Sequence, residues 1–136
     1  RVCECAGVNG IILSERRSAQ VNETVIKVSS GAAFSIDIAR VVNINTAIKE
    51  LKDNGYWVYG ADSDGESMYG VDFSGKTALV IGSEGEGIKR LVKENCDKIV
   101  AIPMAGRINS LNAAAACAVL VYEIKRQCGF LGSKIE

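Results

Sequence analysis

The 136-residue sequence contains no histidine and one proline, and its 16 basic residues are balanced by 16 acidic ones. The absence of histidine removes the side chain that most often acts as a general base near neutral pH. It also removes the mixed cysteine–histidine ligand sets that commonly hold zinc. A net charge of zero argues against tight non-specific binding of nucleic acid by the chain alone, because neutralised phosphates supply most of that affinity. Any such contact must come from local basic patches, a dimer surface or another domain.

Long apolar runs are also absent, and no stretch has the length needed to cross a bilayer or the pattern of a secretory signal. The five cysteines are odd in number and form no CxxC pair, which argues against a disulfide framework or a zinc site. We expect buried, reduced thiols in a cytoplasmic protein at Cys3, Cys5, Cys96, Cys117 and Cys128. The composition, 48% hydrophobic and 24% charged, fits one α/β domain over residues 1–136. Arg1 opens a predicted helix abruptly, and we expect further sequence ahead of it.

Short strand-like runs alternate with helical patterns, which is typical of an α/β domain with a mostly parallel sheet flanked by helices. The patterns predict strands at 10–13, 38–42, 56–61, 77–82 and 98–102. They predict helices at 1–6, 22–29, 45–54, 88–95 and 111–127. The unbroken apolar run TALVIG at 77–82 indicates a central strand buried on both faces. The polar segment 62–66 is expected to be a loop.

Ligands of open parallel sheets bind beyond the carboxyl ends of the strands, where the first candidate loop, GSEGEG, occupies residues 82–87. Its glycine spacing differs from that of a dinucleotide fingerprint, and it lacks the lysine of a P-loop. Glu84 and Glu86 disfavour a phosphate and suit a cationic ligand. S-adenosylmethionine, which carries a sulfonium and an ammonium group, fits that description. A tight turn with acidic residues near a helix start is at least as simple an interpretation.

The second candidate loop, 103–112, is dense in small and polar residues and leads into a nearly all-apolar helix start. Ser110 can serve as the N-cap of that helix, and Gly106 can simply permit a turn. Asn112 can be a solvated residue in the first turn. The four alanines at 113–116 indicate close packing, either within the domain or at a dimer contact.

Several stretches in their order along the chain resemble the SpoU (TrmH-like) family of RNA ribose methyltransferases. They are RVCECAGV at 1–8, ALVIGSEGEG at 78–87, and IPMAG at 102–106 followed by SLN at 110–112. KVSSGAA at 27–33 is also similar to a family segment. The resemblance covers essentially the whole chain, and the ordered set is specific where no single motif would be. Within the family, the chain looks closest to the branch that modifies a guanosine of large-subunit ribosomal RNA.

The resemblance implies transfer of a methyl group from S-adenosylmethionine to a ribose 2′-hydroxyl of RNA. It also implies a cytoplasmic homodimer, a deep C-terminal trefoil knot that holds the methyl donor, and no metal. Positions that match the family's donor site, with their neighbours in the same loop, are Gly82, Ile102, Met104, Gly106 and Leu111. Positions that match its catalytic set are Arg1, Glu84, Ser110 and Asn112.

The family's first motif places an asparagine and a glycine several residues before the arginine, whereas this chain begins at Arg1. We therefore expect the strand that feeds the motif, and part of the catalytic centre, to be missing. A separate N-terminal RNA-binding domain, frequent in the family, would account for the neutral charge.

Other functions remain open at this stage. A non-catalytic RNA-binding or assembly module on the same scaffold would bind RNA without binding a methyl donor. A ribose methyltransferase that acts on transfer RNA would carry the same motifs. A nucleotide-dependent α/β enzyme would bind NAD or ATP, but the glycine spacing disfavours it.

Overall fold

The computed structural model describes residues 1–16 and 20–129 of the chain. Its helices and 3₁₀ turns are α1 (Val2–Cys5), α2 (Glu23–Val28), η1 (Ala32–Phe34), α3 (Ile44–Asp53), η2 (Met68–Gly70), α4 (Arg90–Asn95) and α5 (Ala113–Cys128). None of the described helices combines the length and apolar character needed to span a membrane.

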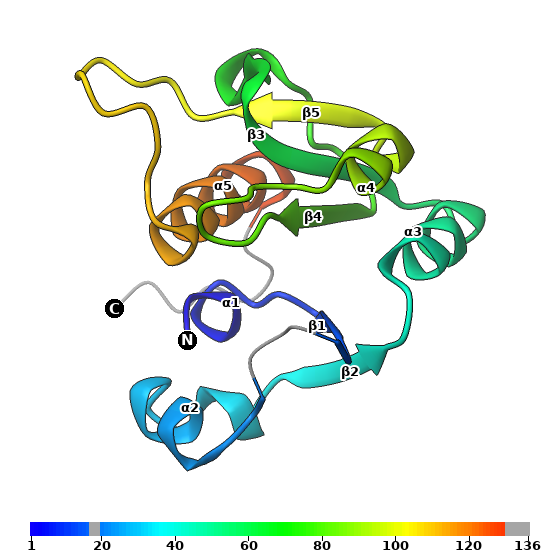
Figure 1. Cartoon of the computed structure of the whole chain (residues 1–136), viewed down its shortest axis with the longest axis vertical. Coiled ribbons are helices and arrows are strands. Elements are labelled where there is room, and N and C mark those ends of the chain that lie inside the picture. The colour runs from blue at the N-terminus through cyan, green and yellow to red at the C-terminus, as the bar shows by residue number, and fades with distance from the viewer. Residues whose placement is uncertain (17–19, 130–136) are drawn as a thin grey trace.

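The strands form two separate parallel sheets where the sequence predicted one (Figure 1). In the smaller sheet, β1 (Gly10–Ser14) pairs with β2 (Asp37–Val41). In the larger sheet, β3 (Trp57–Ser67) lies between β4 (Thr77–Ile81) and β5 (Lys98–Ala101). The predicted class, α/β with parallel strands flanked by helices, is therefore confirmed, and the expectation of a single sheet is wrong for the described residues.

β4 lies at an edge of the larger sheet, although its unbroken apolar run predicted a central strand. All five of its residues are half-buried, and Leu79 and Ile81 pack against the hydrophobic core. The central position belongs to β3, where Val58 and Tyr59 are 0% and 4% exposed. An apolar run shows that other elements cover a strand, and it does not show how many strands lie beside it.

β3 extends beyond the predicted strand because it resumes pairing after an interruption. Its register with β5 shifts between Ala61 and Glu66, so the residues between them form a bulge without ladder partners. The prediction of a loop at 62–66 is wrong, because β3 runs through this segment, most of which forms the bulge. Gly65 permits it, because a Cβ atom there would lie 2.6 Å from the backbone of β5. The bulge places polar side chains at the carboxyl edge of the sheet.

The hydrophobic core joins the larger sheet to one side of α5 (Figure 1). Leu120 of α5 and Phe73 are both 0% exposed, and the Phe73 ring meets the Tyr59 ring edge-on with centroids 4.8 Å apart. Gln127 adds polar contacts: its Oε1 accepts the Phe73 N–H at 2.8 Å, and its Nε2 donates to the Val71 carbonyl at 3.0 Å. These contacts fix α5 against the segment between β3 and β4.

Asparagine side chains begin two of the helices that matter here. The Asn22 side chain accepts the Val25 N–H at 3.0 Å, so the predicted cap of α2 is confirmed. For α5 the cap is Asn112, whose Oδ1 accepts the Ala115 N–H at 2.7 Å. The expectation that Ser110 caps this helix is wrong, because the helix begins two residues later than that assignment requires.

α1 packs against α5 through a pair of thiols. Cys3 and Cys117 are half-buried, and their Sγ atoms lie 4.0 Å apart in a hydrogen bond. A disulfide bond is about 2 Å long, so these thiols are reduced. The shared hydrogen bond lowers the pKa of Cys3 to about 6 and raises the pKa of Cys117. Cys5 and Cys128 are exposed, so the expectation of buried cysteines is wrong for these two.

Replacing Phe73 with alanine should lower the free energy of unfolding by about 3–5 kcal/mol, the cost of emptying a fully buried aromatic site. Urea denaturation followed by circular dichroism measures this change. Phe34, which is 78% exposed, offers the matched control, and its alanine variant should stay within about 0.5 kcal/mol of the parent. Equal losses for the two variants would contradict the assignment of the core.

Candidate functional site

A cleft of about 600 Å³ opens at the carboxyl edge of the larger sheet. The ends of all three strands, the loops that follow β4 and β5, and the first half of α5 line it. Val100 and Leu120 belong to both the cleft lining and the hydrophobic core, so the floor of the cleft is part of the core. The volume falls in the range of roughly 300–1,000 Å³ that is usual for small-molecule sites.

The cleft brings together most of the residues that the sequence singled out, namely Gly82, Glu84, Ile102, Met104, Ser110, Leu111 and Asn112. Gly106 belongs to the same loop as Met104 but does not line the cleft. A Cβ atom on Gly106 would have no neighbour within 4 Å, so its surroundings do not require glycine.

The loop 82–87 folds back tightly on itself. Ser83 and Gly87 exchange backbone hydrogen bonds of 3.2 and 2.9 Å. A Cβ atom on Gly82 would lie 2.3 Å from the carbonyl carbon of Gly87, and Gly85 and Gly87 have φ values of +85° and +67°. Glycine is therefore needed for the backbone path itself. The tight-turn interpretation of this loop is confirmed, and the turn also forms one wall of the cleft.

Asp62 and Ser63 also line the cleft, although the sequence marked their segment only as a loop. Asp62 accepts hydrogen bonds from Lys93 Nζ at 3.1 Å and from the Ser63 N–H at 2.7 Å. Burial raises the pKa of Asp62, but these hydrogen bonds outweigh it and lower the pKa below its usual value. The hydrogen bond from Lys93 to Asp64 raises the pKa of Lys93 most, and the hydrogen bond to Asp62 raises it further. Asp62 and Ser63 are the first polar residues after the apolar part of β3. That position at the end of a parallel strand was the signal in the sequence that could have identified them as cleft residues.

The charge of the cleft is one-sided. Among the residues that the structure describes, its lining includes the carboxylates Asp62, Glu84 and Glu86 and no lysine or arginine. Such a lining suits a cationic or uncharged polar ligand better than a phosphate. Within the described ranges, no three His, Cys, Asp or Glu side chains are grouped so that they could hold a metal ion.

Arg1 is exposed and lies outside the lining, at the start of α1. α1 packs on α5: Cys3 contacts Cys117, and the Gly7 carbonyl accepts a hydrogen bond from Lys125 Nζ at 2.9 Å. The structure does not bring this arginine together with the other predicted residues, most of which line the cleft.

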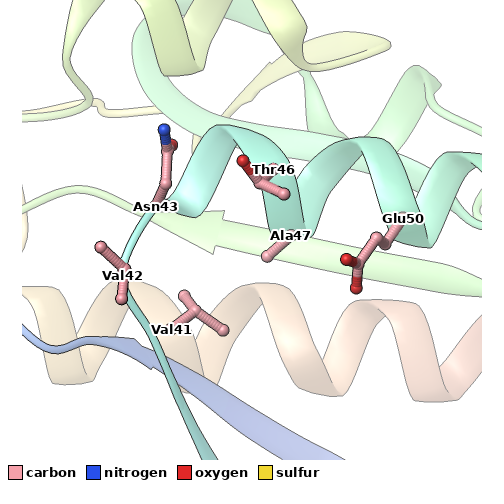
Figure 2. A pocket seen from close by; sticks show the side chains of 6 residues that line it. All are labelled: Val41, Val42, Asn43, Thr46, Ala47 and Glu50. Carbon is pink, nitrogen blue, oxygen red and sulfur yellow. The ribbon is translucent and has the colours of Figure 1, made fainter.

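A smaller hollow of about 290 Å³ lies where β2 meets α3 (Figure 2). It is lined by Val41, Val42, Asn43, Thr46, Ala47 and Glu50. The Asn43 side chain is engaged in capping α3, and few polar groups remain to orient a ligand. The larger cleft, which holds the predicted residues, is therefore the candidate functional site.

Substituting alanine at Gly82 should lower the free energy of unfolding by about 1–3 kcal/mol, because the new methyl group must displace backbone atoms of the loop. The same substitution at Gly106 should cost less than about 0.5 kcal/mol, since the site is open. Urea denaturation of both variants provides the comparison. A Gly82 variant as stable as the parent would show that the loop does not fold back in this way.

Comparisons with known proteins bear on the identity of this cleft. The model of the SpoU rRNA Methylase family matches residues 1–122. The chain is 43% identical over 135 residues to a Staphylococcus saprophyticus protein named for the TrmH family of tRNA/rRNA methyltransferases; the match covers 98% of the chain and 54% of the relative. The chain thus spans about half the length of that relative.

Solved structures give the same result. The SpoU methyltransferase AviRb from Streptomyces viridochromogenes, in complex with AdoMet, matches with a TM-score of 0.83 and 30% identity, over 93% of this chain and 52% of that one. An AdoMet-bound rRNA methyltransferase from Sinorhizobium meliloti matches with a TM-score of 0.85 and 28% identity, over 93% of this chain and 49% of that one. Because the family model matches nearly the whole chain and the fold agrees, this chain belongs to the SpoU methylase family.

Proposed function

We propose that the chain carries the methyl-donor site of an S-adenosylmethionine-dependent RNA methyltransferase that modifies a ribose 2′-hydroxyl. The observation that carries the proposal is the cleft, where the described part of the chain forms an acidic wall without lysine or arginine at the carboxyl edge of a parallel sheet. Both loops that resemble family motifs line this one cleft. AdoMet is bound in two of the similar structures, which supports the same ligand for this chain.

The residues of the cleft fit S-adenosylmethionine. Glu84 and Glu86 suit the positive groups of the donor, and the partly exposed side chains of Met104 and Leu111 offer an apolar surface for the adenine. When bound, the donor supplies an activated methyl group. The residues that would hold it, largely through backbone groups, are Gly82, Ile102, Met104 and Leu111.

The protein must also align the target ribose with the methyl group and assist removal of the proton from its 2′-hydroxyl. Arginine side chains are poor general bases, because a guanidinium does not give up its proton in proteins. We assign Arg1 to orienting an RNA phosphate or stabilising the developing alkoxide. Ser110 offers a hydroxyl, and Asn112 offers its Nδ2 because its Oδ1 caps α5. Both would position the nucleotide, and Glu84 would organise the pocket.

The target and the assembly are part of the same proposal. A guanosine of large-subunit ribosomal RNA is the preferred substrate by resemblance, and transfer RNA is the competing one. Val119 and Tyr122 on α5 are 37% and 45% exposed, which supports packing of a second copy there as a homodimer. The trefoil knot remains a prediction from the resemblance, and the single catalytic domain and the cytoplasmic location remain predictions from the sequence.

Titration calorimetry of the chain with S-adenosylmethionine should show stoichiometric binding. Changing Leu111 to aspartate should weaken it by at least about tenfold, because a fourth carboxylate replaces an apolar contact in the cleft. Ile108 is 78% exposed and outside the lining, so its aspartate variant is the matched control and should bind like the parent. RNA binding without donor binding would favour a non-catalytic module on the same scaffold.

In an enzyme that includes the segment expected ahead of Arg1, replacing Arg1 with alanine should reduce methyl transfer to RNA by at least about a hundredfold, because a transition-state contact is lost. The donor Kd should stay within about twofold, since Arg1 lies outside the cleft lining. Transfer of labelled methyl groups to large-subunit ribosomal RNA and to transfer RNA measures the first effect. Resistance of the product to alkaline hydrolysis maps the modified ribose. Undiminished transfer by the variant would remove Arg1 from the mechanism.

A further inference from the structure

Asp62 holds a position in the cleft to which the proposed chemistry assigns no role. It follows Ala61, the last residue of β3 that pairs with both neighbouring strands before the bulge. Its side chain is 26% exposed and lines the cleft. A Cβ atom on Gly87 would lie 3.9 Å from Asp62 Oδ2, so this oxygen faces the folded-back loop 82–87. The carboxylate therefore lies where the central strand and the loop after β4 meet.

The contacts of Asp62 leave part of its hydrogen-bonding capacity unused. Oδ1 accepts the Ser63 N–H at 2.7 Å and the Ser63 hydroxyl at 3.4 Å. Oδ2 accepts Lys93 Nζ at 3.1 Å. A carboxylate has about four acceptor positions, two on each oxygen. Oδ2, the oxygen beside Gly87, therefore retains an acceptor position for a ligand.

The ion pair with Lys93 determines which ligand group suits this position. Lys93 Nζ lies 3.1 Å from Asp62 and 2.7 Å from Asp64, so one ammonium group serves two carboxylates. Because a cation already lies beside Asp62, a second cation gains less there than at an unpaired carboxylate. An uncharged hydroxyl donor meets no such repulsion and forms a charge-assisted hydrogen bond.

We propose that Asp62 binds a ribose hydroxyl in the nucleoside half of the methyl donor and that Lys93 is the positioning residue that holds the carboxylate in place. The inference rests on the proposed donor site. Dinucleotide-binding sheets offer a physical precedent, since an acidic side chain that follows a parallel strand there accepts a hydrogen bond from a ribose hydroxyl. Asp62 makes the cleft selective for a ribonucleoside donor.

Calorimetric titration with S-adenosylhomocysteine and with its 2′-deoxy and 3′-deoxy counterparts tests this assignment. The parent chain should bind one of the two deoxy compounds about tenfold more weakly than the complete compound, the usual effect of losing a charge-assisted hydrogen bond. An Asp62→Ala variant should lose about as much affinity for the complete compound and nothing further for that deoxy compound. Asp64→Ala is the matched control, because Asp64 pairs with Lys93 outside the cleft lining. It should preserve the discrimination.

The possible results distinguish a wrong role for Asp62 from a wrong assignment of the donor site. Equal affinity of the parent for all three compounds would overturn the role of Asp62 without reference to any variant. An Asp62→Ala variant that weakens the complete and deoxy compounds by the same factor would overturn it as well. Failure of the parent to bind the complete compound would instead overturn the donor site on which the inference rests.

Discussion

Burial of Leu120 and Val100 between α5 and the larger sheet is the contact on which the cleft depends. Both side chains are 0% exposed, and both belong to the core and to the cleft floor. Gln127 holds the far end of α5 through hydrogen bonds to Val71 and Phe73. The start of the helix is thereby fixed beside the carboxyl edge of the sheet. The core packing and the hydrogen bonds that hold α5 against the sheet therefore also determine the width of the cleft.

The folded-back backbone of the loop 82–87 contributes both to the stability of the fold and to ligand recognition in the cleft. Its folded-back path requires glycine at 82, 85 and 87 and leaves the two glutamates as its larger side chains. On the neighbouring strand, the bulge after Ala61 brings Asp62 against this loop, where Lys93 fixes its carboxylate. The result is an acidic wall beside an apolar floor, formed from segments that are separated in the sequence. Such a wall favours donors whose reactive group is positive.

Local rules predicted the elements of this chain better than their arrangement. The strand at 98–102 and the cap at Asn22 follow from β-branched runs and N-cap chemistry, which depend on neighbours in sequence. The placement of β4 at a sheet edge could not be read from its apolar run, because strand order is set by contacts distant in sequence. For the same reason the role of Asp62 was missed: its partner Lys93 lies 31 residues further along the chain.

The two candidate loops were located correctly because loops after parallel strands converge on one sheet edge. The roles of single residues within them needed coordinates. Asn112 proved to cap α5 while also lining the cleft, and Gly106 proved to lie outside the lining. Arg1 is oriented by the packing of α1 on α5, which the sequence did not indicate.

Amide NMR of the ¹⁵N-labelled chain during titration with S-adenosylmethionine tests the central claim most directly. The account predicts chemical-shift changes at 61–63, 82–87 and 102–113, with the hollow at 41–50 unaffected. Changes confined to 41–50, or none at saturating donor, would contradict the assignment of the cleft as the methyl-donor site.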